Sequence, residues 1–129
     1  MRQHLGLTAL VVRDYDEALA YYVGKLGFEL REDTQLDGDK RWVVVAPPGS
    51  VESAILLAKA ANARQEEAIG NQSGGRVFLF LVTDDFARDH TNFLKQGVKF
   101  VTLPRREAYG TVAVFEDLYG NRWDLIERS

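Results

Sequence analysis

The 129-residue sequence contains no cysteine and only two histidines. Without cysteine the chain can form no disulfide, no thiolate zinc site and no cysteine nucleophile. It also lacks an excess of basic residues, because 16 Lys and Arg stand against 19 Asp and Glu, for a net charge of −3. No basic patch or arm stands out, and nucleic acid is therefore not expected as a partner.

Long apolar runs are missing as well. No apolar segment approaches the roughly 20 residues that a membrane-spanning helix needs. The first strand-like run begins near Leu5, which leaves no room for a secretory signal peptide. We therefore expect a cytoplasmic protein with no membrane partner. With 46% hydrophobic and 27% charged residues, the composition is typical of a globular domain.

The first half of the chain predicts one helix and four strands. An apolar run at residues 5–12 ends in β-branched residues and predicts a buried strand. Asp14 and Glu17 resemble a capping box, and apolar residues at helical spacing continue to Leu26, before Gly27 ends the helix. Three further strands are predicted at residues 28–36, 41–46 and 52–58.

A polar, alanine-rich stretch at residues 59–75 follows, and it predicts a long connection with at most a helical turn, either a linker or a lid. The second half then repeats the order of the first. Its elements are a strand at 76–82, a helix at 86–94, a strand at 98–103, a charged loop at 104–108, and strands at 111–115 and 122–127.

The two halves can be superimposed at one offset. Residues 12–14 (Val-Arg-Asp) match residues 82–84 (Val-Thr-Asp), and Gly27 matches Gly97. Each matching residue in the second half stands 70 positions after its counterpart in the first half. Several matches at one offset favour an internal duplication over a chance similarity of two α+β units.

We therefore predict an α+β fold in which residues 1–129 form a single domain of two tandem βαβββ modules. The modules are residues 1–58 and 76–129, joined by a linker at 59–75. One helix can cover only one face of a four-stranded sheet. The remaining faces are expected to form a curved mixed sheet around a central cavity, which would be the natural site for a ligand.

Three segments carry a family resemblance. They are VVRDYDEALAYYVGKLGFEL at residues 11–30, RVFLFLVTDD at 76–85 and VFEDLYGNRWDLIE at 114–127. With them the sequence resembles, along its whole length, the vicinal oxygen chelate superfamily of glyoxalases, bleomycin resistance proteins and ring-cleaving dioxygenases. The resemblance implies the two-module, glyoxalase-like fold, usually completed in a homodimer. We therefore expect a second copy of the chain as a partner.

Metal-using members of that family carry four ligands, typically His or Glu, on the first and fourth strands of each module. By the resemblance, these positions correspond to Leu7, Leu56, Val77 (or Phe78 if the register slips by one residue) and Asp124. Hydrocarbon side chains cannot bind a divalent cation, and one carboxylate alone does not hold it. His4 lies near the terminus and His90 on the second helix, so neither is expected to substitute. We expect no metal and no cofactor.

Asp124 is a carboxylate among apolar neighbours in the last strand. Strand alternation places it on the same sheet face as Arg122 and Ile126. In an apolar cavity its pKa would be perturbed, and it could act as a general base or bind a cationic or hydroxylated ligand. The alternatives are an ion pair with Arg122 or Arg41, or a remnant of an ancestral metal ligand.

Three further residues are candidates for the same site. Arg105 and Tyr109 precede a strand and could clamp a carboxylate or phosphate, although a solvated charged loop would look the same. Trp42 could line a pocket or belong to the core. The candidate ligand-binding residues are thus Asp124, Leu7, Leu56, Val77, Trp42, Arg105 and Tyr109.

Three functions remain open from the sequence. The first is a metal-free protein that binds a small organic molecule in a largely apolar cavity, similar to the antibiotic-sequestering members of the family. The second is a metal-dependent enzyme of the glyoxalase or dioxygenase type with relocated ligands. The third is a metal-free, isomerase-like enzyme that uses Asp124 as a base. The hydrocarbon residues at three ligand positions favour the first.

Overall fold

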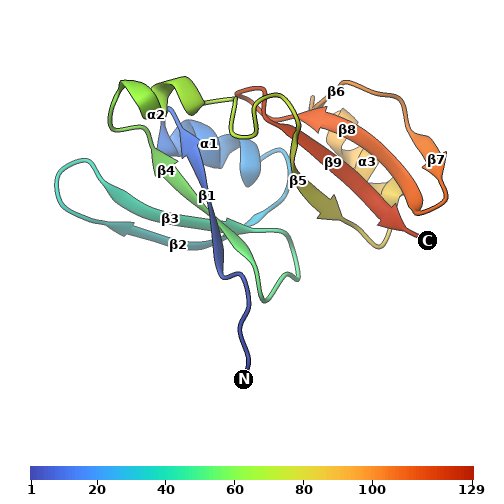
Figure 1. Cartoon of the computed structure of the whole chain (residues 1–129), viewed down its shortest axis with the longest axis horizontal. Helices are drawn as coiled ribbons and strands as arrows, with labels where there is room; N and C mark the ends of the chain where they lie inside the picture. The colour runs from blue at the N-terminus through green and yellow to red at the C-terminus, as the bar shows by residue number, and fades with distance from the viewer. The chain divides into compact units, whose positions relative to one another are not determined.

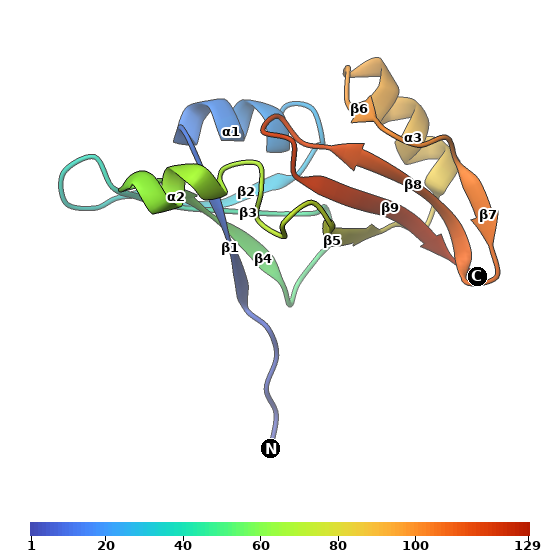
Figure 2. The same cartoon turned by 45° about the horizontal axis from the view of Figure 1, so that its top comes forward.

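The computed structural model describes residues 1–129 as a mixed α+β fold. The chain divides into two compact units, unit 1 (residues 1–69) and unit 2 (residues 70–129). Figures 1 and 2 show a sheet backed by one helix in each unit. The α+β class and the two tandem modules predicted from the sequence are confirmed. No helix of the structure is long and apolar enough to cross a membrane.

Unit 1 contains four strands and two helices. They are β1 (Leu7–Val12), α1 (Tyr15–Tyr22), β2 (Glu29–Gln35), β3 (Arg41–Ala46), β4 (Ala54–Lys59) and α2 (Ala63–Ala68). The strand order is β1-β4-β3-β2, with β1 parallel to β4 and the other pairs antiparallel.

Helix α1 begins where the sequence predicts it. The Asp14 carboxylate accepts a hydrogen bond from the Glu17 backbone N–H at 2.8 Å, which satisfies one of the free donors of the first turn. The helix ends at Tyr22, earlier than predicted, and residues 23–27 form a turn that closes at Gly27, with φ at +76°. Tyr15, Ala18 and Tyr22 are buried on the face that meets the sheet.

The sheet of unit 1 has one covered and one open face. Side chains that point toward α1 are at most 5% exposed, and they come from alternate positions of three strands: Leu10, Val12, Val43, Val45, Ile55 and Leu57. The intervening positions include Leu7, which is 43% exposed, and the half-buried Trp42 and Leu56. Alternation therefore separates the core from an open apolar face.

Unit 2 repeats this plan with one extra strand. Its elements are β5 (Val77–Val82), α3 (Phe86–Lys95), β6 (Lys99–Phe100), β7 (Arg105–Glu107), β8 (Gly110–Glu116) and β9 (Arg122–Arg128). The strand order is β5-β9-β8-β6, with β7 also paired to β8.

The prediction of a strand at 98–103 followed by a loop at 104–108 is wrong in detail. Only Lys99 and Phe100 form β6, and the charged stretch forms β7. The Thr102 hydroxyl accepts the Val114 N–H at 2.9 Å, and Pro104 has no N–H to contribute to the ladder. Pairing to β8 is therefore interrupted and resumes at Arg105.

The stretch predicted as a long connection contains a short helix. Asn62 caps α2 by accepting the Gln65 N–H at 2.9 Å, and the Gln65 side chain accepts the Ala61 N–H at 2.7 Å. The units divide directly after it, and Gly70 passes close to the β8–β9 turn, where an added Cβ would lie 2.0 Å from the Tyr119 carbonyl oxygen. Glycine at φ +75° is needed there.

Candidate functional site

Strand pairing makes Leu56 and Asp124 equivalent positions of the two sheets. In unit 1 Val44 pairs with Leu56, and in unit 2 Val114 pairs with Asp124. Val114 stands 70 residues after Val44, which is the offset of the duplication. The two fourth-strand positions assigned from the resemblance therefore correspond to each other structurally.

The neighbours of these two residues on the parallel strand differ. Leu56 is paired with Ala9 on β1, whereas Asp124 is paired with Phe80 on β5. Val77 is paired with Arg122, and the pairing is irregular between Val77 and Leu79. Phe80, rather than Val77, is thus the residue of β5 beside Asp124. Sequence reasoning missed Phe80 because every position from 77 to 82 is apolar, and no pattern shows which ones share a face.

Asp124 lines a hollow of about 370 Å³ in the open face of the unit 2 sheet. Phe80 and Val82 are 62% and 59% exposed there, while Asp124 is only 9% exposed. The full lining is Phe80, Val82, Tyr109, Asp124, Ile126 and Arg128. The site is a carboxylate set into a mainly hydrocarbon wall, with polar groups at its rim.

The Asp124 carboxylate is not neutralised by a direct partner. Its Oδ1 is buried and makes no hydrogen bond. Burial raises the pKa of Asp124 above its usual 3.8, and the positive charge of Arg105 acts in the opposite direction. Arg122 pairs with Glu116 at 3.6 Å, and Arg41 pairs with Asp33 at 2.7 Å in unit 1. The ion pair considered for Asp124 with Arg122 is therefore not formed within unit 2.

The tight hairpin of β7 and β8 brings Tyr109 to the hollow and Arg105 close enough for its charge to act on Asp124. Gly110 starts β8 at φ +151°, and a Cβ there would lie 2.2 Å from the Glu127 carbonyl oxygen. The Arg105 Nε donates to the Glu107 carboxylate at 2.9 Å. Tyr109 and Glu107 raise the pKa of the Arg105 guanidinium. Tyr109 is 47% exposed and lines the hollow.

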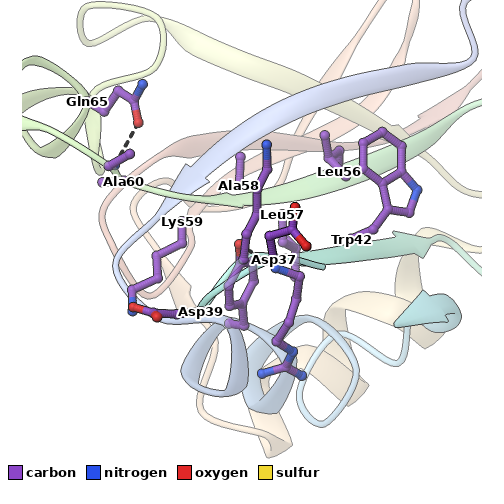
Figure 3. Close-up of a pocket in the computed structure, with 13 residues that line it drawn as sticks. Asp37, Asp39, Trp42, Leu56, Leu57, Ala58, Lys59, Ala60 and Gln65 are labelled. Atoms are coloured by element: carbon purple, nitrogen blue, oxygen red, sulfur yellow. Dashed lines mark hydrogen bonds between the residues drawn. The ribbon is translucent and has the colours of Figure 1, made fainter. Parts of the chain in front are cut away.

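Unit 1 contains a larger hollow, of about 700 Å³, at one end of β3 and β4. Figure 3 shows Trp42 and Leu56 at one end of it and Asp39 and Lys59 at the other. Trp42 and Leu56, predicted separately, are thus brought to one site. Leu7 lines neither this hollow nor the one at Asp124, and neither does Val77.

Three of the four positions that the resemblance assigns to metal ligands carry hydrocarbon side chains. Leu7 and Leu56 of unit 1 and Val77 of unit 2 have no donor atoms, and no group of three or more His, Cys, Asp or Glu that could hold a metal ion is found. His90 lies between aromatic rings, with ring centroids 5.3 Å from Phe86 and 4.5 Å from Phe100. It is a packing residue of α3.

Comparisons with known proteins agree over the whole chain. The sequence model of the Glyoxalase/Bleomycin resistance protein/Dioxygenase superfamily matches residues 4–125. An uncharacterized protein of Shewanella frigidimarina (strain NCIMB 400) is 59% identical over 128 residues, covering 98% of this chain and 95% of that protein.

Two crystal structures are similar in both sequence and fold. UcmS2 is 30% identical, with 98% of both chains covered and a TM-score of 0.84. TnmS3, an antibiotic binding protein from Streptomyces sp. CB03234, is 28% identical, with 99% of this chain and 98% of that chain covered and a TM-score of 0.79.

Proposed function

Because the chain belongs to the glyoxalase/bleomycin resistance protein/dioxygenase superfamily, we propose that it binds a small organic molecule in a largely apolar site and does so without a metal ion. This is the first of the three functions left open by the sequence. It requires an accessible apolar surface with few polar groups, and it requires no ligand set for a cation.

The observation that carries the proposal is the solitary position of Asp124. Its partners across the sheet are Phe80 and Val114, both hydrocarbon, and the hollow around it contains no second acidic side chain. One carboxylate among hydrocarbon suits the recognition of an organic molecule better than that of a metal ion, which needs three or four donors.

The similarity to TnmS3 supports a binding function. That protein binds an antibiotic, and it shares the fold over nearly all of this chain. By analogy, this chain would bind an organic molecule of drug-like size. The analogy concerns the class of ligand and not its identity.

We also propose that the protein acts in the cytoplasm as a homodimer. Strand β1 is an edge strand of the unit 1 sheet, and its first residue Leu7 is 43% exposed, while Leu5 just before it is 80% exposed. Open sheet edges with apolar side chains favour pairing with another chain. Sedimentation that gives only a monomer at micromolar concentration would contradict the dimer.

The metal-free part of the proposal is tested by elemental analysis of the purified protein together with a thermal-shift screen of small molecules, run with and without a chelator. We expect substoichiometric transition metal, and at least one compound class that raises the melting temperature equally in both conditions. About one metal ion per chain, with a melting temperature that falls on chelation, would refute it.

A second candidate, metal-free acid–base catalysis by Asp124, is favoured by one observation. Burial raises the pKa of Asp124, which is a property of catalytic carboxylates. Tyr109 is the only other proton-transfer group that lines the hollow. Mass spectrometry of a compound recovered after prolonged incubation distinguishes the two functions, because binding returns it unchanged.

A further inference from the structure

We propose that the hollow of unit 2 selects a molecule with an aromatic body and a neutral hydroxyl group, and that this hydroxyl donates a hydrogen bond to the carboxylate of Asp124. The inference rests on the binding function proposed above and specifies its ligand class. It concerns unit 2 alone, in which the acceptor and the lining of the hollow are found.

The first step of the argument is the unsatisfied acceptor. An ionised carboxylate accepts hydrogen bonds and donates none, and Oδ1 of Asp124 has no donor within the protein. A buried acceptor without a partner is unfavourable in the free protein. A ligand that brings a donor to the Asp124 carboxylate offsets that penalty, so the structure favours donors over molecules of the same shape that lack one.

The second step is the charge around the acceptor. Arg105 lies close enough for its charge to act on Asp124, and the Arg128 side chain lines the same hollow. An ammonium ligand would be repelled by the positive charges of Arg128 at the hollow and of Arg105 near Asp124, and it would lose its hydration on entry. A neutral hydroxyl forms a charge-assisted bond to the carboxylate without either penalty. The donor is therefore inferred to be a hydroxyl.

The third step is the shape and lining of the hollow. Phe80 and Tyr109 present exposed rings, and Val82 and Ile126 complete the apolar wall. Aromatic rings are favourable neighbours for another ring in offset or edge-on geometry. The volume of about 370 Å³ lies near the lower end of the range for small-molecule sites, which suits a molecule of one or two rings.

The experiment uses the full chain, labelled with ¹⁵N, and three probes of one size: 2-naphthol, 2-methoxynaphthalene and 2-naphthylmethylammonium. Each is titrated at pH 7 while the amide resonances of β5 and β9 are followed. We expect 2-naphthol to bind about tenfold more tightly than each of the others, as one charge-assisted hydrogen bond implies.

The matched variants are Asp124→Leu and Asp84→Asn. Leucine is the residue that unit 1 carries at the equivalent position, Leu56. The Asp124→Leu variant should therefore bind 2-naphthol and 2-methoxynaphthalene with an affinity ratio of about one. Asp84 is an exposed carboxylate at the start of α3, and its replacement should leave the preference unchanged. If the leucine variant does not fold, the three probes with the natural chain still decide the question.

Each contrary result has a defined meaning. Equal affinity for 2-naphthol and 2-methoxynaphthalene would overturn the hydroxyl inference and leave the binding function standing. Tighter binding of the ammonium probe would overturn the argument from charge. If no probe shifts a resonance of β5 or β9, the aromatic class is overturned, while the unbiased screen described above still decides the binding function. A preference that survives Asp124→Leu would remove Asp124 from recognition.

Discussion

Leu56 in unit 1 and Asp124 in unit 2 stand at the same point of the same scaffold. Each lies on the last strand of its unit, opposite a valine of the preceding strand, on the sheet face that the unit's main helix leaves open. Leu56 and Trp42 line the hollow of unit 1, and Asp124 and Phe80 line the hollow of unit 2. At this position unit 1 carries a hydrocarbon side chain, and unit 2 carries a carboxylate whose Oδ1 is a buried hydrogen-bond acceptor without a partner.

The strands that flank these positions differ for a separate reason. In unit 1, β2 runs from Glu29 to Gln35 and pairs with β3 over its length, apart from one irregularity. In unit 2 the corresponding stretch is divided into β6 and β7 around Pro104. The division places Arg105 and Tyr109 near Asp124. The duplicated halves thus share their cores and differ at their open faces.

The largest effect is expected from the shared cores. Leu57 and Leu125 occupy equivalent positions beneath α1 and α3, and both are fully buried. Leu57→Ala and Leu125→Ala should each lower the free energy of unfolding by about 2–5 kcal/mol, because each leaves a cavity. Chemical denaturation measures both. A loss below about 1 kcal/mol for either variant would show that the two cores are not equivalent.

Replacing Asp124 by leucine and Leu56 by aspartate should change the free energy of unfolding in opposite directions. Asp124→Leu removes an unsatisfied buried carboxylate and should raise the free energy of unfolding at pH 7 by about 1–3 kcal/mol. Leu56→Asp places a carboxylate in the apolar face of unit 1 and should lower it by a similar amount. A stability loss in Asp124→Leu would mean that Asp124 has a structural partner in solution.

A smaller effect tests the alignment of the two halves. Asp14 caps α1, whereas α3 is capped by Asp85, although Asp84 is the residue that the sequence offset matches to Asp14. Asp14→Ala and Asp85→Ala should each cost about 1 kcal/mol. Asp84→Ala should cost less than about 0.5 kcal/mol, since its contact with Arg88 is an exposed ion pair. Equal losses for Asp84 and Asp85 would contradict this assignment.

The smallest expected effect is the pH dependence of the contribution that Asp124 makes to the free energy of unfolding. Burial raises the pKa of Asp124 in the folded state, so the folded chain binds this proton more tightly than the unfolded chain. The carboxyl group therefore favours folding most below its usual pKa of 3.8, and this contribution is lost as the pH rises through the folded-state pKa.

The stability gained by Asp124→Asn should accordingly be largest at pH 7 and shrink as the pH falls toward 4. Other carboxyl groups, such as Asp33, whose pKa is lowered by its hydrogen bond to Arg41, are present in both proteins and cancel in the difference. Denaturation of the natural chain and Asp124→Asn over this range provides the measurement. A gain that grows on acidification would show that the folded-state pKa of Asp124 is lowered.

Local signals in the sequence determined much of this protein. The capping residue Asp14 predicted the start of α1, and the valine-rich run at 41–46 predicted β3 with its observed bounds. The family resemblance predicted the superfamily and a mixed α+β fold with two sheets, and both are confirmed. These features could be read because they depend on residues close together in the chain, whose propensities act before tertiary packing does.

The register of β5 could be decided only by the tertiary structure. Val12 is fully buried, but Val82, which the sequence offset matches to it, is 59% exposed. An irregularity in the pairing of β5 near Phe78 shifts the strand, so that Val82 corresponds to Val11. In a run where every residue is apolar, both faces look alike, and only the pairing with β9 determines which side chains meet the helix.

The hydrogen-bonding environment of Asp124 could likewise not be predicted from the sequence. Its strand and its sheet face followed from alternation, and both agree with the structure. Its unpaired Oδ1 did not follow, because that depends on the partner that Arg122 takes, which is Glu116. The sequence supplied the carboxylate, and the packing of strands left its Oδ1 buried without a hydrogen-bond donor.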